Sequence, residues 1–298
     1  MYDVAIVGGG PAGLSAALVL GRCCRSIVVC DSGHYRNASS GGVHGFLTRD
    51  GVHPAELRRI GRDQLECYGV EYRTLKVADA RRRERGFWLA LEDGASLECR
   101  RLLLATGVTD HIPETEGFRR YYGSSVFHCP YCDGWEVRDE PLAAYGKGRG
   151  GAGLAVSLRT WSRDVVLCSD GPAALGPAHA ANLARLGIQV VQRRILRLEG
   201  SETRLEQIVF EDGSVLARRA LFLNIAQSQR CDFASKLGCR LTRRGAVRTG
   251  NMERTGVPGL FVAGDSSKDV QSAIVAAAEG AKAAMAINKS LRDEDDSL

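Results

Sequence analysis

A glycine-rich loop with the spacing G-x-G-x-x-G occurs twice in this chain of 298 residues, each time between an apolar run typical of a strand and a run typical of a helix. The six glycines are Gly8, Gly10, Gly13, Gly146, Gly148 and Gly151. Strand, tight loop and helix in this order are typical of a parallel sheet that is covered by helices. The sequence therefore predicts an α/β protein with two Rossmann-like, three-layer dinucleotide-binding domains.

The order of these units along the chain predicts that one domain is inserted into the other. The second unit begins at Leu142, before a strand over 258–264 and an alanine-rich helix over 270–288 that would complete the first domain. We therefore expect residues 1–112 and 245–298 to form a split domain, and residues 113–244 to form the inserted domain. The acidic end of the chain, from Arg292 onward, is expected to fray.

The composition is that of an ordinary globular protein, with 44% hydrophobic, 25% charged and 6% aromatic residues. The net charge of +5 is spread over short basic runs, which predicts no nucleic-acid partner but would suit an acidic electron-donor protein. The uncharged run from Val4 to Gly21 is interrupted by glycines and by Pro11, and no basic region precedes it. We therefore expect no membrane span, no export signal and a cytoplasmic location.

The first glycine loop carries the features of a dinucleotide site. Gly8 would permit the tight turn, Gly10 would let the backbone approach a pyrophosphate, and Gly13 would let the helix pack on the strand. Pro11 and Ala12 complete the loop and begin the helix, whose N-terminus would face the phosphates. The loop is therefore predicted to hold the diphosphate of a dinucleotide.

Further residues predict which dinucleotide binds. Asp31 ends the second strand, where a carboxylate would accept a hydrogen bond from an adenosine ribose, and Ser32 follows it. Residues 255–265, TGVPGLFVAGD, resemble the second FAD fingerprint of flavoproteins with two dinucleotide domains, in which the last residue, here Asp265, reaches the ribityl and pyrophosphate region. Residues 105–107, ATG, resemble another turn of the same group. Together these segments predict FAD.

Two cysteines lie between the two units, in the sequence Cys-Pro-Tyr-Cys-Asp-Gly over 129–134. Thiols at the spacing of Cys129 and Cys132 can close into a disulfide, and one thiolate of such a pair often has a lowered pKa that suits thiol–disulfide exchange. Asp133 could move protons there. Zinc binding is one alternative, but the chain has no second ligand pair at comparable spacing and His128 would leave the shell incomplete, so we expect no metal. Two unrelated thiols are the other alternative.

These motifs resemble those of the low-molecular-weight thioredoxin reductases over nearly the whole chain. The resemblance implies a fold of the class II pyridine nucleotide-disulfide oxidoreductase type, with FAD in the split domain and the redox motif in the inserted, NAD(P)-type domain. It implies that Cys132 faces the flavin, that Cys129 exchanges with a thioredoxin-like protein, and that Asp133 donates a proton. It also implies a homodimer, and an inserted domain that swings so that dithiol and nicotinamide alternate at the flavin.

The same resemblance assigns further residues to FAD. They are Thr106, Gly107, His44, Val77, Gln271 and Ser272. For His44, a histidine that only satisfies a turn is the alternative. The reductases carry an arginine–glutamine pair at the start of the last helix, where this chain has Gln271 and Ser272. The resemblance therefore implies a different hold on the edge of the flavin ring.

The second glycine loop departs from the reductase pattern. The strand after that loop ends, in the reductases, in a histidine-arginine-arginine cluster that holds the 2′-phosphate of NADPH, whereas residues 169–171 here are Ser-Asp-Gly. The carboxylate of Asp170 would repel that phosphate but could accept a hydrogen bond from a ribose hydroxyl. The sequence therefore disfavours NADPH and is compatible with NADH.

These departures resemble a divergent branch of the family. That branch contains atypical thioredoxin reductases without the NADPH signature, and flavin-dependent dithiol oxidases of the gliotoxin and holomycin type. Asp133 is reductase-like, because a histidine often follows the second cysteine in the oxidases. We therefore predict an FAD-dependent disulfide oxidoreductase with an electron donor other than NADPH. A dithiol oxidase that acts on a small dithiol substrate and passes electrons to oxygen is one alternative, and a flavin-binding redox sensor without turnover is the other.

Overall fold

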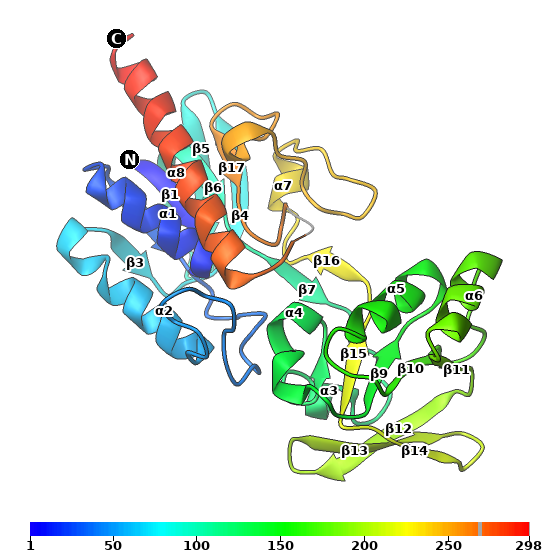
Figure 1. Cartoon of the computed structure of the whole chain (residues 1–298). Coiled ribbons are helices and arrows are strands. Elements are labelled where there is room, and N and C mark those ends of the chain that lie inside the picture. The colour runs from blue at the N-terminus through cyan, green and yellow to red at the C-terminus, as the bar shows by residue number, and fades with distance from the viewer. Residues whose placement is uncertain (268–269, 298) are drawn as a thin grey trace. The chain divides into compact units, whose positions relative to one another are not determined.

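The computed structural model describes residues 1–267 and 270–297 and divides into two compact units (Figure 1). Unit 1 consists of Met1–Ala38, Gly45–Thr109 and Gln227–Leu298, and unit 2 of Ser39–His44 and Asp110–Ala226. Each unit contains a parallel sheet with helices packed on it, which confirms the α/β fold with two Rossmann-like units. Within the part of the chain that the structure describes, no helix is both long and apolar enough to traverse a bilayer.

The sheet of unit 1 has seven strands in the order β3-β2-β1-β6-β5-β4, with β17 also paired to β6. β4 and β5 form an antiparallel extension on β6, and the other pairs are parallel. All four residues of β2 are buried, as a parallel strand covered on both faces requires. The strands are β1 (Tyr2–Val7), β2 (Ile27–Cys30), β3 (Glu71–Arg73), β4 (Val77–Arg83), β5 (Gly86–Leu91), β6 (Ser96–Leu104) and β17 (Leu260–Val262).

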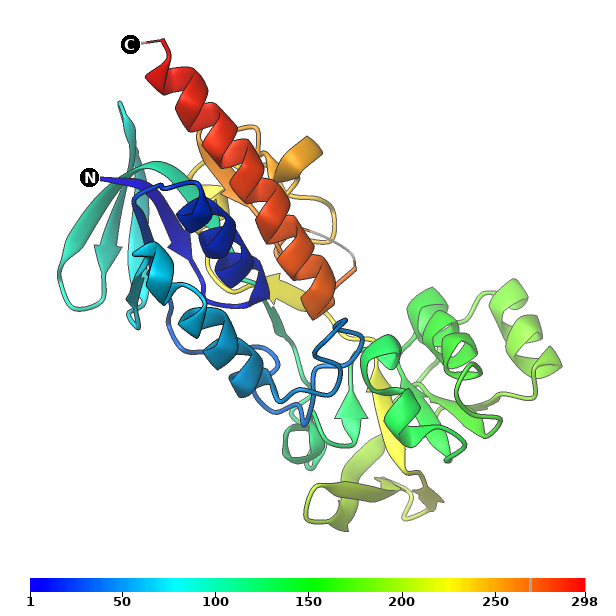
Figure 2. The ribbon, with the colours of Figure 1, turned by 60° about the vertical axis from the view of Figure 1, so that its left-hand side comes forward.

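The first and last helices of unit 1 lie side by side on the sheet, although they are far apart in the sequence (Figure 2). They are in close contact, because a Cβ added at Gly280 of α8 would collide with the carbonyl group of Ala12 in α1. The helical segments of this unit are α1 (Pro11–Arg22), α2 (Pro54–Asp63), η1 (Glu66–Tyr68), α7 (Phe233–Lys236), η3 (Asn251–Glu253) and α8 (Ala273–Asp295).

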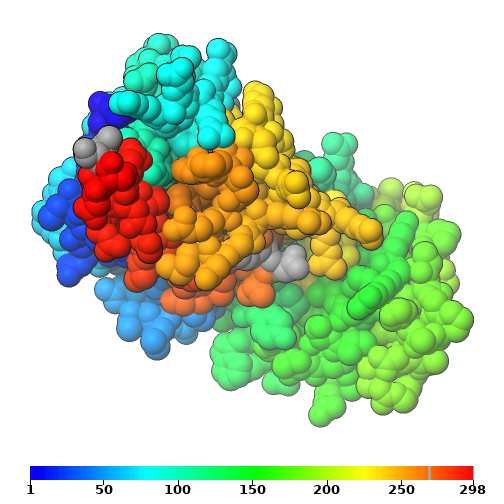
Figure 3. All heavy atoms as spheres, turned by 90° about the horizontal axis from the view of Figure 1, so that it is seen from above, coloured from blue at the N-terminus to red at the C-terminus, as the bar shows by residue number. Residues whose placement is uncertain are grey.

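α8 extends to Asp295, well beyond the predicted end of this helix. Arg100 of β6 pairs with Asp295 at 2.5 Å and with Glu294 at 3.1 Å, so the last turn is tied to the sheet. The prediction that the chain frays from Arg292 onward is therefore wrong for residues 292–295, which are helical. The last turns of α8, coloured red, lie at the surface of unit 1 in Figure 3.

Unit 2 is built on a five-stranded parallel sheet in the order β11-β10-β9-β15-β8, next to an antiparallel sheet β12-β13-β14. The strands are β8 (Val126–Phe127), β9 (Leu142–Tyr145), β10 (Val165–Cys168), β11 (Gln189–Val191), β12 (Ile195–Ser201), β13 (Arg204–Phe210), β14 (Val215–Ala217) and β15 (Ala220–Leu223). The helical segments are α3 (Phe118–Tyr121), α4 (Pro130–Asp133), η2 (Trp135–Val137), α5 (Gly148–Leu158) and α6 (Pro177–Arg185).

The chain returns to unit 1 at Gln227, earlier along the sequence than the predicted position of 245. β7 (Val108–Asp110) and β16 (Gln227–Gln229) pair where the chain crosses between the units, and the contacts assign residues from 227 onward to unit 1 rather than from 245. The reason is a set of apolar side chains in this segment that join the core of the unit 1 sheet. They are Phe233, Ala234, Leu237, Cys239 and Val247.

Candidate functional site

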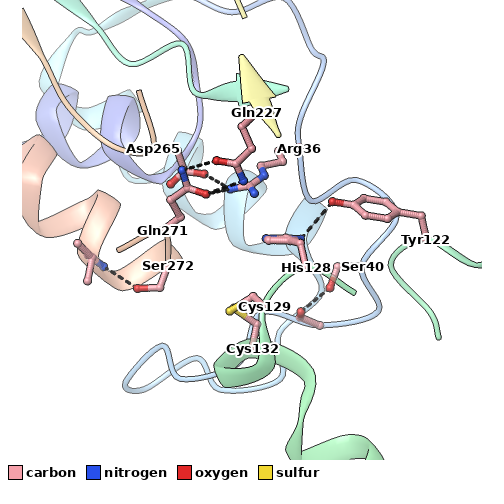
Figure 4. The surroundings of a disulfide bond; sticks show 12 residues. Arg36, Ser40, Tyr122, His128, Cys129, Cys132, Gln227, Asp265, Gln271 and Ser272 are labelled. Carbon is pink, nitrogen blue, oxygen red and sulfur yellow. Dashed lines mark hydrogen bonds and ion pairs between the residues drawn. A yellow bond between two sulfur atoms is a disulfide. The ribbon is translucent and has the colours of Figure 1, made fainter. Parts of the chain in front are cut away.

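Cys129 and Cys132 form a disulfide at the start of the short helix α4 in unit 2 (Figure 4). Cys129 is the N-cap residue, and Pro130 takes the first helical position, where a missing N–H costs no hydrogen bond. The N–H groups of Cys132 and Asp133 both donate to the carbonyl oxygen of Cys129, each at 3.2 Å. This single helical turn sets the two Cα atoms 5.3 Å apart, which is within the range for a disulfide.

Asp133 follows the second cysteine, and its carboxyl group is shielded from water. Burial, with a smaller contribution from the negative charge of Glu136, raises the pKa of Asp133 to about 7. The group can therefore take up and release a proton near neutral pH, which suits a proton carrier beside a dithiol.

His44 lies in unit 2, next to this acidic pair. Its Nδ1 atom is 3.5 Å from Oε1 of Glu136, and the segment Ser39–His44 groups with unit 2. The sequence analysis assigned His44 to the cofactor, alongside residues that lie in unit 1. The structure shows this imidazole in contact with Glu136, whose charge contributes to the raised pKa of Asp133, and the assignment of His44 to the cofactor stays a prediction.

His128, the residue before Cys129, is held by a short hydrogen-bonded chain, whose link to Tyr122 is drawn in Figure 4. The hydroxyl of Tyr122 donates to Oδ2 of Asp110 at 2.7 Å, so its oxygen is the acceptor for Nδ1 of His128 at 3.1 Å. In a neutral imidazole this arrangement assigns the proton to Nδ1 and makes Nε2 the proton acceptor. His128 is partly buried and can exchange a proton at a fixed position beside the dithiol.

Two aromatic side chains next to the disulfide are exposed. Tyr131, between the two cysteines, is 86% exposed, and Trp135 is 64% exposed. The rings of Tyr131 and Trp161 pack nearly at right angles, with centroids 5.5 Å apart, and the Cζ atom of Arg138 lies 4.0 Å from the centroid of the Trp135 ring. Exposed aromatic rings with a stacked arginine are typical of protein-binding surfaces.

In unit 1, the first glycine loop, called the cradle below, has three glycines with different surroundings. Gly8 has a φ of +113°, and an added Cβ would collide with the carbonyl group of Ala105, while one at Gly13 would collide with the carbonyl of Gly8. At Gly10, by contrast, an added Cβ would meet nothing within 4 Å. Packing therefore explains Gly8 and Gly13, whereas Gly10 keeps open the space that a closely approaching phosphate would need. Pro11 and Ala12 begin α1 directly behind this space.

Asp31 lies at the end of β2 and is only 3% exposed. Its Oδ2 atom accepts hydrogen bonds from the hydroxyls of Tyr35 and Tyr72, and its Oδ1 atom accepts one from the N–H of Gly33. Ser32 caps the same turn through the N–H of His34. The carboxylate is thus positioned by three donors at the place where the sequence analysis expected a ribose.

The second flavoprotein fingerprint ends beside the ATG turn, also in unit 1. Ser266 follows Asp265; its hydroxyl donates to the carbonyl of Gly107 at 3.0 Å and lies 3.3 Å from the hydroxyl of Thr106. Asp265 itself is paired with Arg36 at 2.9 Å. The two motifs, far apart in the sequence, therefore form one continuous edge of the cradle.

The start of α8 contributes the last group of predicted cofactor residues. Ser272 is the N-cap and accepts a hydrogen bond from the N–H of Val275. Gln271 accepts from Arg36 at 2.6 Å and exchanges two amide hydrogen bonds with Gln227. Val77, predicted as a further contact, is buried in the core of the sheet at the start of β4.

The second glycine loop lies in unit 2, and polar groups of this unit form hydrogen bonds with one another around it. Gly151 packs against Gly146, as the motif requires, but the N–H of Gly148 donates to the carbonyl oxygen of Ala173 at 2.8 Å. The carboxylate of Asp170 accepts from the N–H of Ile195 at 2.8 Å and from the hydroxyl of Tyr145 at 3.2 Å. Both groups that would meet a nucleotide are thus used within unit 2.

Sequence reasoning missed several residues that the structure places at these sites. They are Tyr35, Arg36, Tyr72, Tyr122 and Gln227. The only available signal was the polar, aromatic segment Gly-His-Tyr-Arg-Asn over 33–37, directly after Asp31. The other residues lie in strands or loops that carry no motif.

Three comparisons with known proteins show which proteins this chain is similar to. The family model described as pyridine nucleotide-disulphide oxidoreductase matches residues 2–280. The chain is 32% identical to the thioredoxin reductase tcpT of Claviceps purpurea, over 92% of this chain and 90% of that protein. It also resembles two solved structures: a putative thioredoxin reductase, TrxB, from Bacillus anthracis (34% identity, TM-score 0.93, 99% of this chain and 100% of that chain) and HlmI (35% identity, TM-score 0.94, 99% and 94%).

Proposed function

The chain belongs to the pyridine nucleotide-disulphide oxidoreductase family and is a thioredoxin reductase-like flavin disulfide oxidoreductase. From this premise, we propose that it relays electrons between FAD and the disulfide of a thioredoxin-like protein through Cys129 and Cys132. The observation that carries the proposal is the disulfide at the N-terminus of α4, beside a carboxyl group whose pKa is raised to about 7.

We further propose that unit 1 is the FAD-binding domain and unit 2 the inserted domain. The family implies FAD, and residues of unit 1 fit it: Gly10 leaves open space at the N-terminus of α1, and Asp265 lies at the edge of the cradle. Both carboxylate oxygens of Asp31 accept hydrogen bonds within unit 1, so its contact with a ribose stays a prediction. When bound, FAD accepts and supplies pairs of electrons, which is the chemistry that a dithiol needs for its regeneration. Assembly as a homodimer remains a prediction, which light scattering checks.

The residues of unit 2 carry the exchange itself. The thiolate of Cys129 attacks the partner's disulfide, which forms a mixed disulfide and releases one partner thiolate. The thiolate of Cys132 then attacks the sulfur of Cys129, which closes the Cys129–Cys132 disulfide and releases the second partner thiolate. The partner gains two electrons and the dithiol loses two. Nε2 of His128 can take up a proton from a thiol of the pair, and protonated Asp133 can donate one to a released thiolate.

We propose that NADPH is not the electron donor. Asp170 lies where the reductases carry cations for the 2′-phosphate, and its carboxylate closes its own turn through Ile195 and Tyr145. The hydrogen bond from Gly148 to Ala173 removes a donor that the diphosphate would need. An acidic electron-transfer protein would suit the net charge of +5.

A dithiol oxidase is the second candidate function. The closed second loop favours it, because electrons would then enter from substrate thiols rather than from a nucleotide. In that case a small dithiol reduces the Cys129–Cys132 disulfide, and oxygen takes up the electrons from the reduced enzyme. Peroxide release on adding a dithiol in air would favour this function, whereas its absence together with thioredoxin reduction by the pre-reduced enzyme would favour the reductase.

An anaerobic titration of the holoenzyme tests the assignment of the donor. We expect NADPH to leave the flavin absorbance unchanged over minutes, whereas dithionite bleaches it. NADH is the informative second nucleotide, because bleaching by NADH alone would mean that Asp170 opens to accept a ribose hydroxyl. Fast bleaching by NADPH would contradict the proposal.

Replacing Gly10 by alanine tests the cradle. The added methyl group meets no protein atom within 4 Å, and the φ of −77° suits alanine, so we expect the melting temperature of the apoprotein to change little. The methyl group occupies the space left for the diphosphate, so the Kd for FAD should rise at least about tenfold, which corresponds to about 1.4 kcal/mol. Gly10→Ala with unchanged FAD affinity would move the diphosphate elsewhere.

A further inference from the structure

Arg36 lies in the loop after β2, and its side chain is only 12% exposed. One terminal nitrogen of its guanidinium donates to Oδ2 of Asp265 at 2.9 Å and to Oε1 of Gln271 at 2.6 Å (Figure 4). Gln271 is fixed in turn, because its amide exchanges hydrogen bonds of 3.1 and 2.9 Å with that of Gln227. A largely buried cation therefore joins the end of β17 to the residue just before α8.

This position matters because the guanidinium touches two residues assigned to the flavin end of the cradle. The carboxylate of Asp265 would by itself place a negative charge close to a cofactor that already carries a diphosphate. Arg36 offsets that charge at 2.9 Å, where both side chains are largely withdrawn from water and screening is weak. Arginine keeps its charge under all ordinary conditions, so the compensation is permanent.

We propose that Arg36 is a cofactor-positioning residue that neutralises Asp265 and orients Gln271, so that the cradle tolerates the negative charge that flavin gains on two-electron reduction. This inference rests on the proposed binding of FAD in unit 1. The reductases carry an arginine in the last-helix pair where this chain has Gln271, and here a guanidinium reaches Gln271 from the loop after β2.

Removal of the cation should act on the flavin directly. Arg36→Gln removes the cation that lies 2.9 Å from the Asp265 carboxylate, so the reduced flavin is destabilised more than the oxidised flavin. We expect FAD to bind at least tenfold more weakly, and the preference for reduced flavin to fall about tenfold, which lowers the midpoint potential by about 30 mV for a two-electron couple. Arg36→Lys keeps the positive charge, so the midpoint potential of its bound flavin should stay close to the wild-type value.

Two further variants separate local from general charge effects. Arg59→Gln makes the same charge change on α2, where Arg59 is 55% exposed and pairs with Glu56 and Asp63, and it should shift neither quantity. Adding Asp265→Asn to Arg36→Gln removes both charges and should restore the potential, because the pair acts as a unit.

Potentials are measured spectroscopically against reference dyes, and FAD affinity by fluorescence quenching. The inference would be overturned if Arg36→Gln bound FAD with a Kd within twofold of the wild-type value and its midpoint potential stayed within about 10 mV of the wild-type potential. A wild-type protein that binds no FAD would instead overturn the proposed function, so the two failures are distinguishable.

Discussion

Serine at either Cys129 or Cys132 is expected to lower disulfide-exchange turnover at least about 1,000-fold, because each sulfur performs a step that an alcohol cannot. FAD content should stay at the wild-type level, since both cysteines lie in unit 2 and the cradle residues lie in unit 1. The assay measures the reduction of a thioredoxin disulfide and uses dithionite-reduced enzyme as the electron source.

The two serine variants should differ in what they trap. Cys132→Ser retains the attacking thiol but cannot resolve the mixed disulfide, so a covalent complex with thioredoxin should accumulate and appear on a non-reducing gel. Cys129→Ser should form none. The reverse pattern would exchange the roles of the two cysteines, and equal trapping by both variants would contradict an ordered relay.

Asparagine at Asp133 is expected to lower turnover about 100- to 10,000-fold, which is the usual loss when a general acid is removed. In the wild-type protein, the rate of the proton-dependent step should fall as the pH rises through about 7, since burial raises the pKa of Asp133 to about 7 and the proton is lost above that value. The variant should lack this limb of the pH–rate profile, which stopped-flow measurements across pH 5 to about 9 would record.

The same substitution should affect stability in the opposite direction. Asp133 has an ordinary pKa of 3.8 and a folded-state pKa of about 7, so the folded state binds the proton more tightly. The stabilisation that Asp133 gives the folded state is therefore fully present below its ordinary pKa, and it is lost as the pH rises through the folded-state pKa. At pH 8 the buried carboxylate is ionised, which destabilises the folded state because the surrounding protein solvates the charge less well than water does. Asparagine carries no charge and avoids this cost.

Asp133→Asn should therefore unfold at higher denaturant concentration than the wild type at pH 8, with a free energy of unfolding that is larger by a few kcal/mol. The difference should shrink toward pH 4, where both side chains are neutral in the folded state. A variant that loses activity and is also less stable at pH 8 would show that Asp133 is a structural anchor rather than a proton carrier.

The sequence predicted the parts of this molecule whose cause is local. The glycines at 8 and 13 are required by collisions with the backbone of the same Rossmann-like unit, so their spacing was sufficient to identify it. The Cys-x-x-C motif is also local, since Pro130 and the hydrogen bonds to the carbonyl of Cys129 close one helical turn. Both motifs are read from fewer than about ten consecutive residues, the range in which pattern reasoning is most informative.

Contacts between distant segments were beyond this reasoning. The pair Arg36–Asp265 joins residues 229 positions apart, and no periodicity connects the loop after β2 with the end of β17. The early return of the chain to unit 1 has a similar origin, because Phe233 and Leu237 enter the core from a segment without a regular apolar pattern. The contact between His44 and Glu136 is another example, because the family resemblance pointed only to the cofactor for His44.

Counting the electrons that the holoenzyme takes up tests the central claim, that the Cys129–Cys132 pair exchanges electrons with the bound flavin. An anaerobic dithionite titration, followed by flavin absorbance and by labelling of new thiols, measures this uptake for the wild type and for Cys129→Ser. The relay predicts that the wild type accepts twice as many electrons per FAD as the variant, since the flavin and the disulfide each take two. Equal uptake by the two proteins, with no new thiol at Cys129 or Cys132, would contradict it.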